Sequence, residues 1–224
     1  MASGADTHPE IDHVLIAVDD LAEAAHALRT TYGLTSVEGG RHPDWGTANS
    51  IVPLGDAYLE LITVVDELQA SRSVFGCWVR DANPIPGFLG WAARIEDLDE
   101  VVRRHRLVPT EGSRARPDGQ ILRWRIAGLE QAALEPCLPF FIEWAPDTAL
   151  PGRAPVTHAA GPLRITELRV KGAADQLDNW LGPNELPIVV SPGAPATAAV
   201  VLKRPAGKDI ILDAAELLTH VRTE

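Results

Sequence analysis

An internal repeat constrains the fold of this chain more than any other feature of its sequence. The segment VDDLAEA at residues 18–24 returns as IEDLDEV at residues 95–101, an offset of 77 residues (95 − 18). In both copies an aspartate is followed three residues later by a glutamate, a capping pattern typical of the first turn of a helix. We therefore expect one structural unit to occur twice in the chain.

Each copy lies within the same order of expected elements. In the first, a β-branched and aliphatic run at residues 11–18 predicts a buried strand, and the amphipathic helix after it ends at Gly33. Three further runs predict strands, and the second copy closes in the same way with LPFFIEWAP at residues 138–146. The sequence thus predicts an α+β fold in which two βαβββ modules, residues 10–66 and 86–146, pair into one cupped mixed sheet.

Two ionisable side chains fall among apolar neighbours in the expected strands. Alternation places His13 on one face with Leu15, and Glu60 on one face with Tyr58. A buried imidazole and a buried carboxylate are costly unless something compensates them, and a metal ion compensates both. For His13 the plain alternative is a strand histidine whose hydrogen bonds are satisfied within the protein.

The closing strands of the two modules also align. YLEL at residues 58–61 matches FIEW at residues 141–144, which pairs Glu60 with Glu143 at an offset of 83 (143 − 60). The intervening loops are long enough to absorb the six extra residues (83 − 77). In these residues, and in GGRHPDWGTAN at residues 39–49, the chain resembles the glyoxalase-like branch of the vicinal oxygen chelate superfamily.

The resemblance implies a metal held by the first and last strand of each module. Carried over residue by residue, it implies that His13, Glu60 and Glu143 are ligands and that Glu143 also serves as the catalytic base. The fourth place falls on Gly90, which leaves an open coordination site or a ligand from elsewhere. One imidazole and two carboxylates suit Mn²⁺, Fe²⁺, Ni²⁺ or Zn²⁺ without distinguishing among them.

Two polar residues between the modules' strands are further candidates. His42 lies among Gly39, Gly40 and Pro43, so it belongs to a loop or the entry of a strand. It is either an exposed histidine or a residue that reaches the cup as a fourth ligand, a general base or a substrate contact. Asn49 either hydrogen-bonds the substrate or caps a turn.

The second module offers candidates for anion binding. Arg123 alternates with Trp124, so either the tryptophan face is core and the arginine is solvated, or Arg123 lines the cup and binds substrate. Arg114, in a loop flanked by glycine and proline, has the same two alternatives. Trp144 alternates with Glu143, and we expect it to pack against a helix on the other face of the sheet.

Beyond residue 146 the chain changes character. Residues 147–162 are rich in proline, alanine and glycine and read as a linker. Residues 163–224 again suggest strand, helix and three strands, a third and shortened module without a carboxylate at the ligand position. We expect it to have a structural role or to mediate self-association as a homodimer.

Composition narrows the partners. Twenty Lys and Arg against 31 Asp and Glu give a net charge of −11, which argues against nucleic acid because a phosphate backbone requires clustered positive charge. No apolar run is long enough to span a membrane, and the first ten residues lack an export signal. The two isolated cysteines form no disulfide framework, which favours the reducing cytoplasm.

Two functions are compatible with these features. The first is a metalloenzyme that acts on a small molecule with adjacent oxygens, by lyase, isomerase or dioxygenase chemistry, since the ion would stabilise a developing enolate or oxyanion. The second is a metal-free protein of the same fold that binds or sequesters a small molecule. The fold alone does not choose between them.

Overall fold

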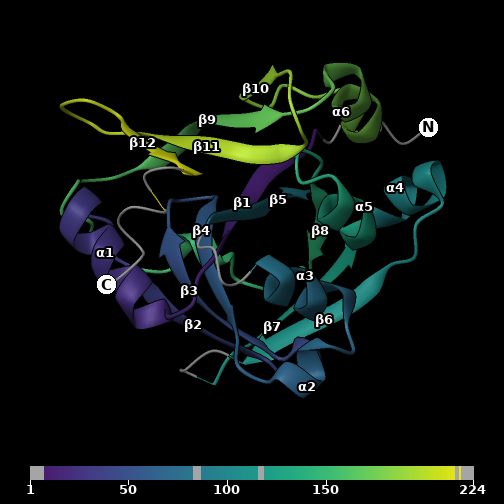
Figure 1. Ribbon diagram of the computed structural model, residues 1–224, viewed down its shortest axis with the longest axis horizontal. Helices are drawn as coiled ribbons and strands as arrows, with labels where there is room; N and C mark the ends of the chain where they lie inside the picture. Colours follow the sequence, from purple (N-terminus) through teal and green to yellow (C-terminus); the bar gives the residue numbers. More distant parts are fainter. Residues whose placement is uncertain (1–7, 83–86, 116–118, 215–216, 218–224) are drawn as a thin grey trace.

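The computed structural model describes residues 8–82, 87–115, 119–214 and 217. These residues form two β-sheets, one of eight strands and one of four, with helices packed on them (Figure 1). Among them, no helix is both long and apolar enough to cross a membrane. Most of the last segment of the chain, where the sequence suggests a final helical turn, lies outside this range.

The first unit has the predicted order of strand, helix and three strands. It consists of β1 (Glu10–Ala17), α1 (Leu21–Tyr32), β2 (Val37–His42), the 3₁₀ helix η1 (Pro43–Trp45), β3 (Thr47–Pro53) and β4 (Tyr58–Val64). The carboxylate of Asp20 accepts hydrogen bonds from the amides of Ala22 and Glu23 and so begins α1. Gly33, with a φ of 69°, ends this helix in the left-handed conformation.

The second unit repeats this order with three additional helices, two before its first strand and one before its last. It consists of α2 (Glu67–Ala70), α3 (Val74–Ala82), β5 (Gly87–Arg94), α4 (Leu98–His105), β6 (Thr110–Ala115), β7 (Ile121–Ala127), α5 (Leu129–Leu134) and β8 (Phe140–Trp144). Asp97 caps α4 by accepting a hydrogen bond from the amide of Glu100, as the repeat predicts. Helix α5 was not expected from the sequence, and it lies immediately before the closing strand.

The two units form a single sheet with the strand order β2-β3-β4-β1-β5-β8-β7-β6. Within each unit the first strand is parallel to the last, and the units join through the antiparallel pair β1–β5. The edge strands β2 and β6 contact each other, so the sheet curves into a nearly closed cup, with α3 in front of it (Figure 1). The predicted α+β fold with a cupped mixed sheet is confirmed.

The register at the centre of the sheet shows how the repeat is built. His13 lies opposite Ala92, and Leu15 lies opposite Gly90. An approximate two-fold axis between β1 and β5 therefore exchanges His13 with Gly90 and Leu15 with Ala92, each pair 77 residues apart (90 − 13, 92 − 15). The offset read from the helix starts thus holds for the first strands of both units.

The same axis gives a different result for the closing strands. Leu15 pairs with Glu60 between β1 and β4, and its equivalent Ala92 pairs with Phe140 between β5 and β8. Phe140, at an offset of 80 (140 − 60), is therefore the structural equivalent of Glu60. The sequence match that paired Glu60 with Glu143 is wrong by three residues, because the loops before β8 shift its register.

Each face of the large sheet has its own apolar core. The inner core fills the cup and includes Leu15, Ile62, Trp78 and Trp124. The outer core lies between the sheet, its helices and the third unit. Buried side chains of the outer core come from all three parts of the chain: Val14, Leu28, Leu59, Trp91, Phe141, Leu168, Leu177, Val200 and Leu212.

The third unit covers part of the outer face. The 3₁₀ helix η2 (Pro151–Arg153) lies in the connection that precedes this unit. The unit itself consists of β9 (Arg164–Lys171), α6 (Ala174–Leu181), β10 (Ile188–Ser191), β11 (Ala196–Lys203) and β12 (Ile210–Asp213). Its strand order, β10-β9-β11-β12, differs from that of the other units because its first strand pairs with its second and third. Strand β11 contacts β5, and in Figure 1 this sheet lies across β1 and β5.

Specific contacts fix the third unit and the preceding connection in place. The indole of Trp180 donates a hydrogen bond to the carbonyl of Pro139 (2.8 Å) and packs over Gly128, where a Cβ would lie 2.9 Å from the ring. In the connection, buried His158 accepts from the amide of Thr35 (2.9 Å) and bonds the carbonyl of Pro53 (2.7 Å). The proline-rich stretch therefore packs against the first unit.

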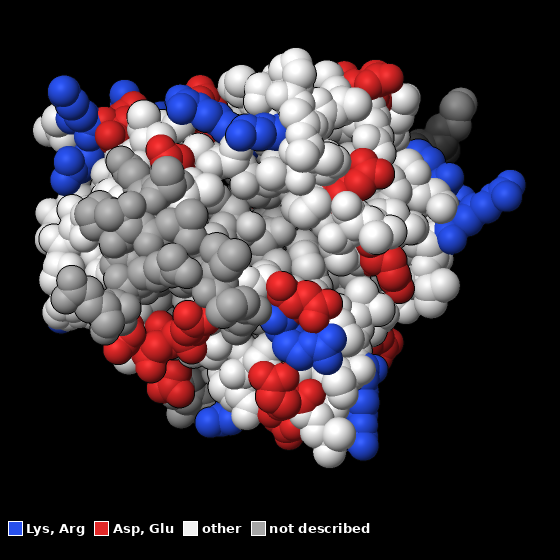
Figure 2. Space-filling view, viewed as in Figure 1, with Lys and Arg blue, Asp and Glu red and all other residues white. Residues whose placement is uncertain are grey.

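The surface in Figure 2 carries Lys and Arg side chains interspersed with Asp and Glu. On this face the basic side chains occur singly or in small groups, with uncharged surface between them. The described residues on this face form no continuous basic area of the kind that a nucleic-acid backbone would contact. That no nucleic acid is a partner stays a prediction.

Candidate functional site

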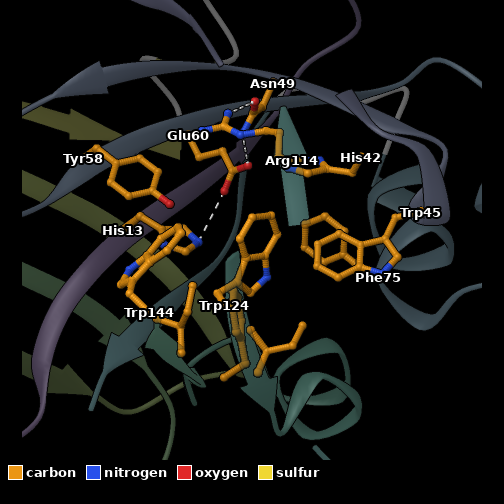
Figure 3. Close-up of a pocket in the computed structure, with 13 residues that line it drawn as sticks. His13, His42, Trp45, Asn49, Tyr58, Glu60, Phe75, Arg114, Trp124 and Trp144 are labelled. Carbon is orange, nitrogen blue, oxygen red and sulfur yellow. Dashed lines mark hydrogen bonds and ion pairs between the residues drawn. The ribbon is translucent and has the colours of Figure 1, made fainter. Parts of the chain in front are cut away.

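A narrow cavity inside the cup brings together most of the candidate residues. The volume of this cavity that water-sized atoms can reach is about 30 Å³. The first unit supplies most of its polar wall, and the second unit supplies most of its apolar wall. The lining side chains are His13, His42, Trp45, Asn49, Tyr58, Glu60, Phe75, Arg114, Trp124, Ile126, Phe140, Ile142 and Trp144 (Figure 3).

A chain of buried polar groups runs along the cavity through His13. Its Nδ1 lies 2.6 Å from Oδ1 of Asp12, and its Nε2 lies 3.3 Å from Oε2 of Glu60 (Figure 3). All three side chains are buried. Because the carboxylate of Asp12 accepts from Nδ1, it orients the ring so that Nε2 faces Glu60 and the cavity. The prediction that His13 and Glu60 share the inner face of the sheet is confirmed.

The series of buried polar groups continues beyond Glu60 to Asn49 on β3 and Arg114 on β6. Asn49 donates from its amide to Oε1 of Glu60 (2.5 Å) and accepts at Oδ1 from Nη1 of Arg114 (2.6 Å). Arg114 is a buried residue of β6, so of its two alternatives the one with a solvated side chain in a loop does not hold. Gly39 makes room for this contact, since a Cβ there would lie 2.0 Å from the oxygen of Asn49.

His42 is the last residue of β2 and is buried, not exposed. Its Nδ1 lies 3.0 Å from the hydroxyl of Thr47, and aromatic rings surround it, including those of Trp45 and Trp124. Burial lowers the pKa of His42 to about 3, and the neighbouring charge of Arg114 acts in the same direction. At neutral pH His42 is therefore an uncharged imidazole that can exchange hydrogen bonds with a ligand.

Tyr58 is a site residue that the sequence did not single out. Its ring stacks on that of His13, with centroids 4.7 Å apart and planes 19° from parallel. Burial raises the pKa of the Tyr58 hydroxyl well above its usual range, and the carboxylates of Asp12 and Glu60 raise it further. The hydroxyl therefore keeps its proton and can donate a hydrogen bond within the cavity.

Glu143 does not reach the cavity. Its Oε2 accepts from Nη1 of Arg125 (3.1 Å) and its Oε1 from the amide of Leu98 (3.3 Å), at the start of α4 on the outer face. The predicted convergence of His13, Glu60 and Glu143 is therefore wrong. A register error of an odd number of residues moves a side chain to the other face of a strand, and the error here is three.

The same error misplaced Trp144, whereas the sequence had left two alternatives open for Arg123 on β7. Trp144 faces the cavity, where its indole donates to Oδ2 of Asp12 (2.8 Å), and does not pack against a helix on the outer face. Trp124 also faces the cavity, whereas Arg123 is exposed and lines an outer groove. Of the two alternatives for this strand, the one with a buried tryptophan face is confirmed, and Arg123 does not line the cavity.

Asp12 was missed because a β-bulge re-aims it. Between β1 and β5, Ile11 pairs with Ala93 and His13 pairs with Ala92, so Asp12 is an extra residue in the ladder. Simple alternation would place Asp12 on the face opposite His13. The bulge instead lets their side chains bond, and no pattern in the sequence marks its position.

The donor set in the cavity does not fit a four-ligand metal site. The other two superfamily positions are held by Gly90 and Phe140, and neither offers a ligand atom. The place beside Gly90 is filled by the indole of Trp78, since a Cβ there would lie 2.6 Å from its ring. Of these four positions, only two offer a donor atom: Nε2 of His13 and Oε2 of Glu60. Within the described ranges, no three His, Cys, Asp or Glu side chains gather as a metal site would require.

Comparisons with known proteins agree with this fold. The model of the family described as "Glyoxalase-like domain" matches residues 11–184. A hypothetical protein from Staphylococcus aureus superposes with a TM-score of 0.68 at 14% identity, covering 89% of this chain and 92% of that one. The methylmalonyl-CoA epimerase of Mycobacterium tuberculosis gives a TM-score of 0.43 at 23% identity, covering 61% and 88%. No curated protein matches the chain.

Proposed function

Because the chain belongs to the glyoxalase-like domain family, we propose that it is an enzyme that moves a proton on a small molecule with adjacent oxygens, such as a 2-oxo acid. The observation that carries this proposal is the buried series Asp12–His13–Glu60, in which an imidazole lies between two carboxylates at a cavity wall. Such a series supplies a base and an acid within one site. The reaction class is therefore enolisation, with exchange of the carbon-bound proton.

Each residue of the series has a separate role in the proposed reaction. The Glu60 carboxylate takes a proton from the carbon beside the carbonyl group, and Nε2 of His13 gives a proton to the carbonyl oxygen. The products are an enol and protonated Glu60. When the enol oxygen gives its proton back to Nε2 of His13 and Glu60 returns a proton to the carbon, the ketone forms again with its carbon-bound hydrogen exchanged. Asp12 holds the ring and stabilises its charged form, which is the usual role of a carboxylate on Nδ1.

Neighbouring groups support the same steps. The hydroxyl of Tyr58, which keeps its proton, is a further donor for the substrate oxygen. The amide of Asn49 holds Oε1 of Glu60, so that Oε2 remains directed toward His13. His42, uncharged at neutral pH, borders the cavity as a substrate contact. These groups are arranged before the substrate binds, which lowers the cost of reaching the transition state.

The proposal is tested by proton exchange in deuterium oxide. Pyruvate and its longer 2-oxo acid homologues are incubated with the protein, and loss of the signal from the hydrogens at C3 is followed by proton NMR. We expect exchange above the buffer rate, and we expect His13→Gln and Glu60→Gln to lower it by about 10² to 10⁴. Glu143→Gln, an acid-to-amide change outside the cavity, is the matched control and should retain the wild-type rate.

Exchange that is equally fast in His13→Gln and in wild type would refute the proposed roles. Metal analysis of protein purified without chelators or a nickel column then tests the predicted Mn, Fe, Ni or Zn ion. If no 2-oxo acid exchanges its protons but several bind, the protein is instead a metal-free small-molecule binding protein of the same fold. The aromatic lining of the cavity, including Trp45, Phe75 and Trp124, favours that function, namely a binding protein for small apolar or aromatic molecules.

A further inference from the structure

The cavity has much less free space than the two grooves that share its walls. Measured in the same way, the cavity leaves about 30 Å³, whereas the two neighbouring spaces that share its walls leave about 200 and 680 Å³. It therefore holds little more than the oxygen-bearing end of a molecule. Any remaining part of a substrate must lie in a space that shares a wall with the cavity.

One such space is a mainly apolar groove next to the cavity, with Ser73, Thr110 and Glu130 as its polar lining residues. It shares the side chains of Trp45, Phe75 and Ile126 with the cavity, and it leaves about 200 Å³. Val74 and Val108, which also line it, are 42% and 79% exposed. Large aliphatic side chains open to solvent beside a ligand cavity are typical of a surface that a bound molecule covers.

We propose that this groove binds the apolar substituent of the substrate, an alkyl chain of several carbons attached to the oxygen-bearing group in the cavity. The rings of Trp45 and Phe75 lie between the two spaces, with centroids 4.9 Å apart. The backbone of η1 is held by hydrogen bonds from the amides of Val65 and Asp66 to Gly46. Opening between the spaces is therefore a rotation of the Trp45 side chain, which is only half-buried.

A second neighbouring groove has the wrong chemistry for an alkyl chain. It shares Trp124 and Trp144 with the cavity, but its rim is charged. Four carboxylates and two guanidinium groups line it: Asp44, Glu96, Glu111, Glu143, Arg123 and Arg125. An alkyl chain there would remove charged groups from water without replacing their partners. The apolar groove is therefore the one that matches.

The inference rests on the proposed function for the nature of the oxygen-bearing group, and a chain-length series tests it. Pyruvate, 2-oxobutanoate, 2-oxohexanoate and 2-oxooctanoate are titrated while tryptophan fluorescence is followed, because Trp45, Trp124 and Trp144 line the cavity. Each methylene group that enters the groove should lower Kd by about fourfold. The gain should level off once the chain fills the groove.

Variants separate the groove from the cavity. Val74→Asp places a charge in the groove at the first residue of α3, a position where an acidic side chain is compatible with a helix. It should weaken 2-oxooctanoate by tenfold or more and leave pyruvate within twofold of wild type. Leu134→Asp, at an 82% exposed position on α5 outside the groove, is the matched control.

The outcomes are distinguishable. Equal Kd values along the series, or a Val74→Asp variant that binds 2-oxooctanoate like wild type, would overturn the groove and leave the proposed function standing. Failure of every length to bind would overturn both. Chain-length-dependent binding without proton exchange would support the groove and refute the enzyme.

Discussion

Replacing His42 by glutamine should change how stability depends on pH. The folded protein holds His42 uncharged down to a pKa of about 3, because burial removes the water that would solvate the imidazolium ion. In the unfolded chain the same side chain binds a proton near pH 6.5. Between these values the unfolded state binds more protons, so the free energy of unfolding falls as pH falls and is level above about pH 6.5.

The size of the effect follows from this difference. One pH unit corresponds to about 1.4 kcal/mol, so lowering the pH from 6.5 to 5 should cost wild type about 2 kcal/mol through His42 alone. His42→Gln lacks this cost. Because glutamine packs less well among the rings of Trp45 and Trp124, the variant should be less stable at pH 7.5 by about 1 to 3 kcal/mol. The gap between wild type and variant should narrow by about 2 kcal/mol at pH 5.

Urea denaturation at pH 7.5, 6.5, 5.5 and 5 measures this gap. His26→Gln, which removes a histidine from an exposed position of α1, is the matched control. A gap between wild type and His42→Gln that is the same at pH 7.5 and pH 5 would show that His42 takes up its proton in the folded state as well. The reasoning from burial would then be refuted.

Two further variants test the reassigned positions. Gly90→Ala should destabilise the protein by about 1 to 3 kcal/mol in a urea titration, because its Cβ would lie 2.6 Å from the Trp78 ring; a variant as stable as wild type would contradict this packing. Glu143→Gln should change the free energy of unfolding by less than about 1 kcal/mol, since it weakens a half-exposed ion pair with Arg125, and should leave tryptophan fluorescence in the cavity unchanged. A large fluorescence change would place Glu143 nearer the cavity than the contacts indicate.

Local signals in the sequence were sufficient for the first unit. The cap at Asp20, the helix end at Gly33 and the alternation within the strands that carry His13 and Glu60 all depend on residues within a few positions of one another. Tight turns join β2, β3 and β4, so little can shift between these strands. The faces of these two strands were predictable for this reason. The meeting of His13 and Glu60 was implied by the family resemblance, and Asp12 and Tyr58 were missed.

The second unit depended on information that is not local. Whether Phe140 or Glu143 faces the cup depends on the path of the chain through α5 and the residues after it. The sequence FIEW is compatible with either register of the strand. Arg114 joins the site only because the edge strands β2 and β6 approach when the sheet curves. A contact between two strands that are far apart in the sequence produces no periodic pattern of residues that could reveal it.

The docking of the third unit has a consequence for how the protein unfolds. Buried side chains of β9, β11, β12 and α6 share one core with β1, β4 and β8, and the ring of Trp180 closes it over Gly128. Neither part retains a complete core without the other, so the chain should lose its structure in a single cooperative transition, with coincident tryptophan fluorescence and circular dichroism curves. If the chain were cut within residues 147–162, each piece would have an exposed apolar face. Although residues 147–162 resemble a linker, they therefore connect two parts of a single cooperative folding unit.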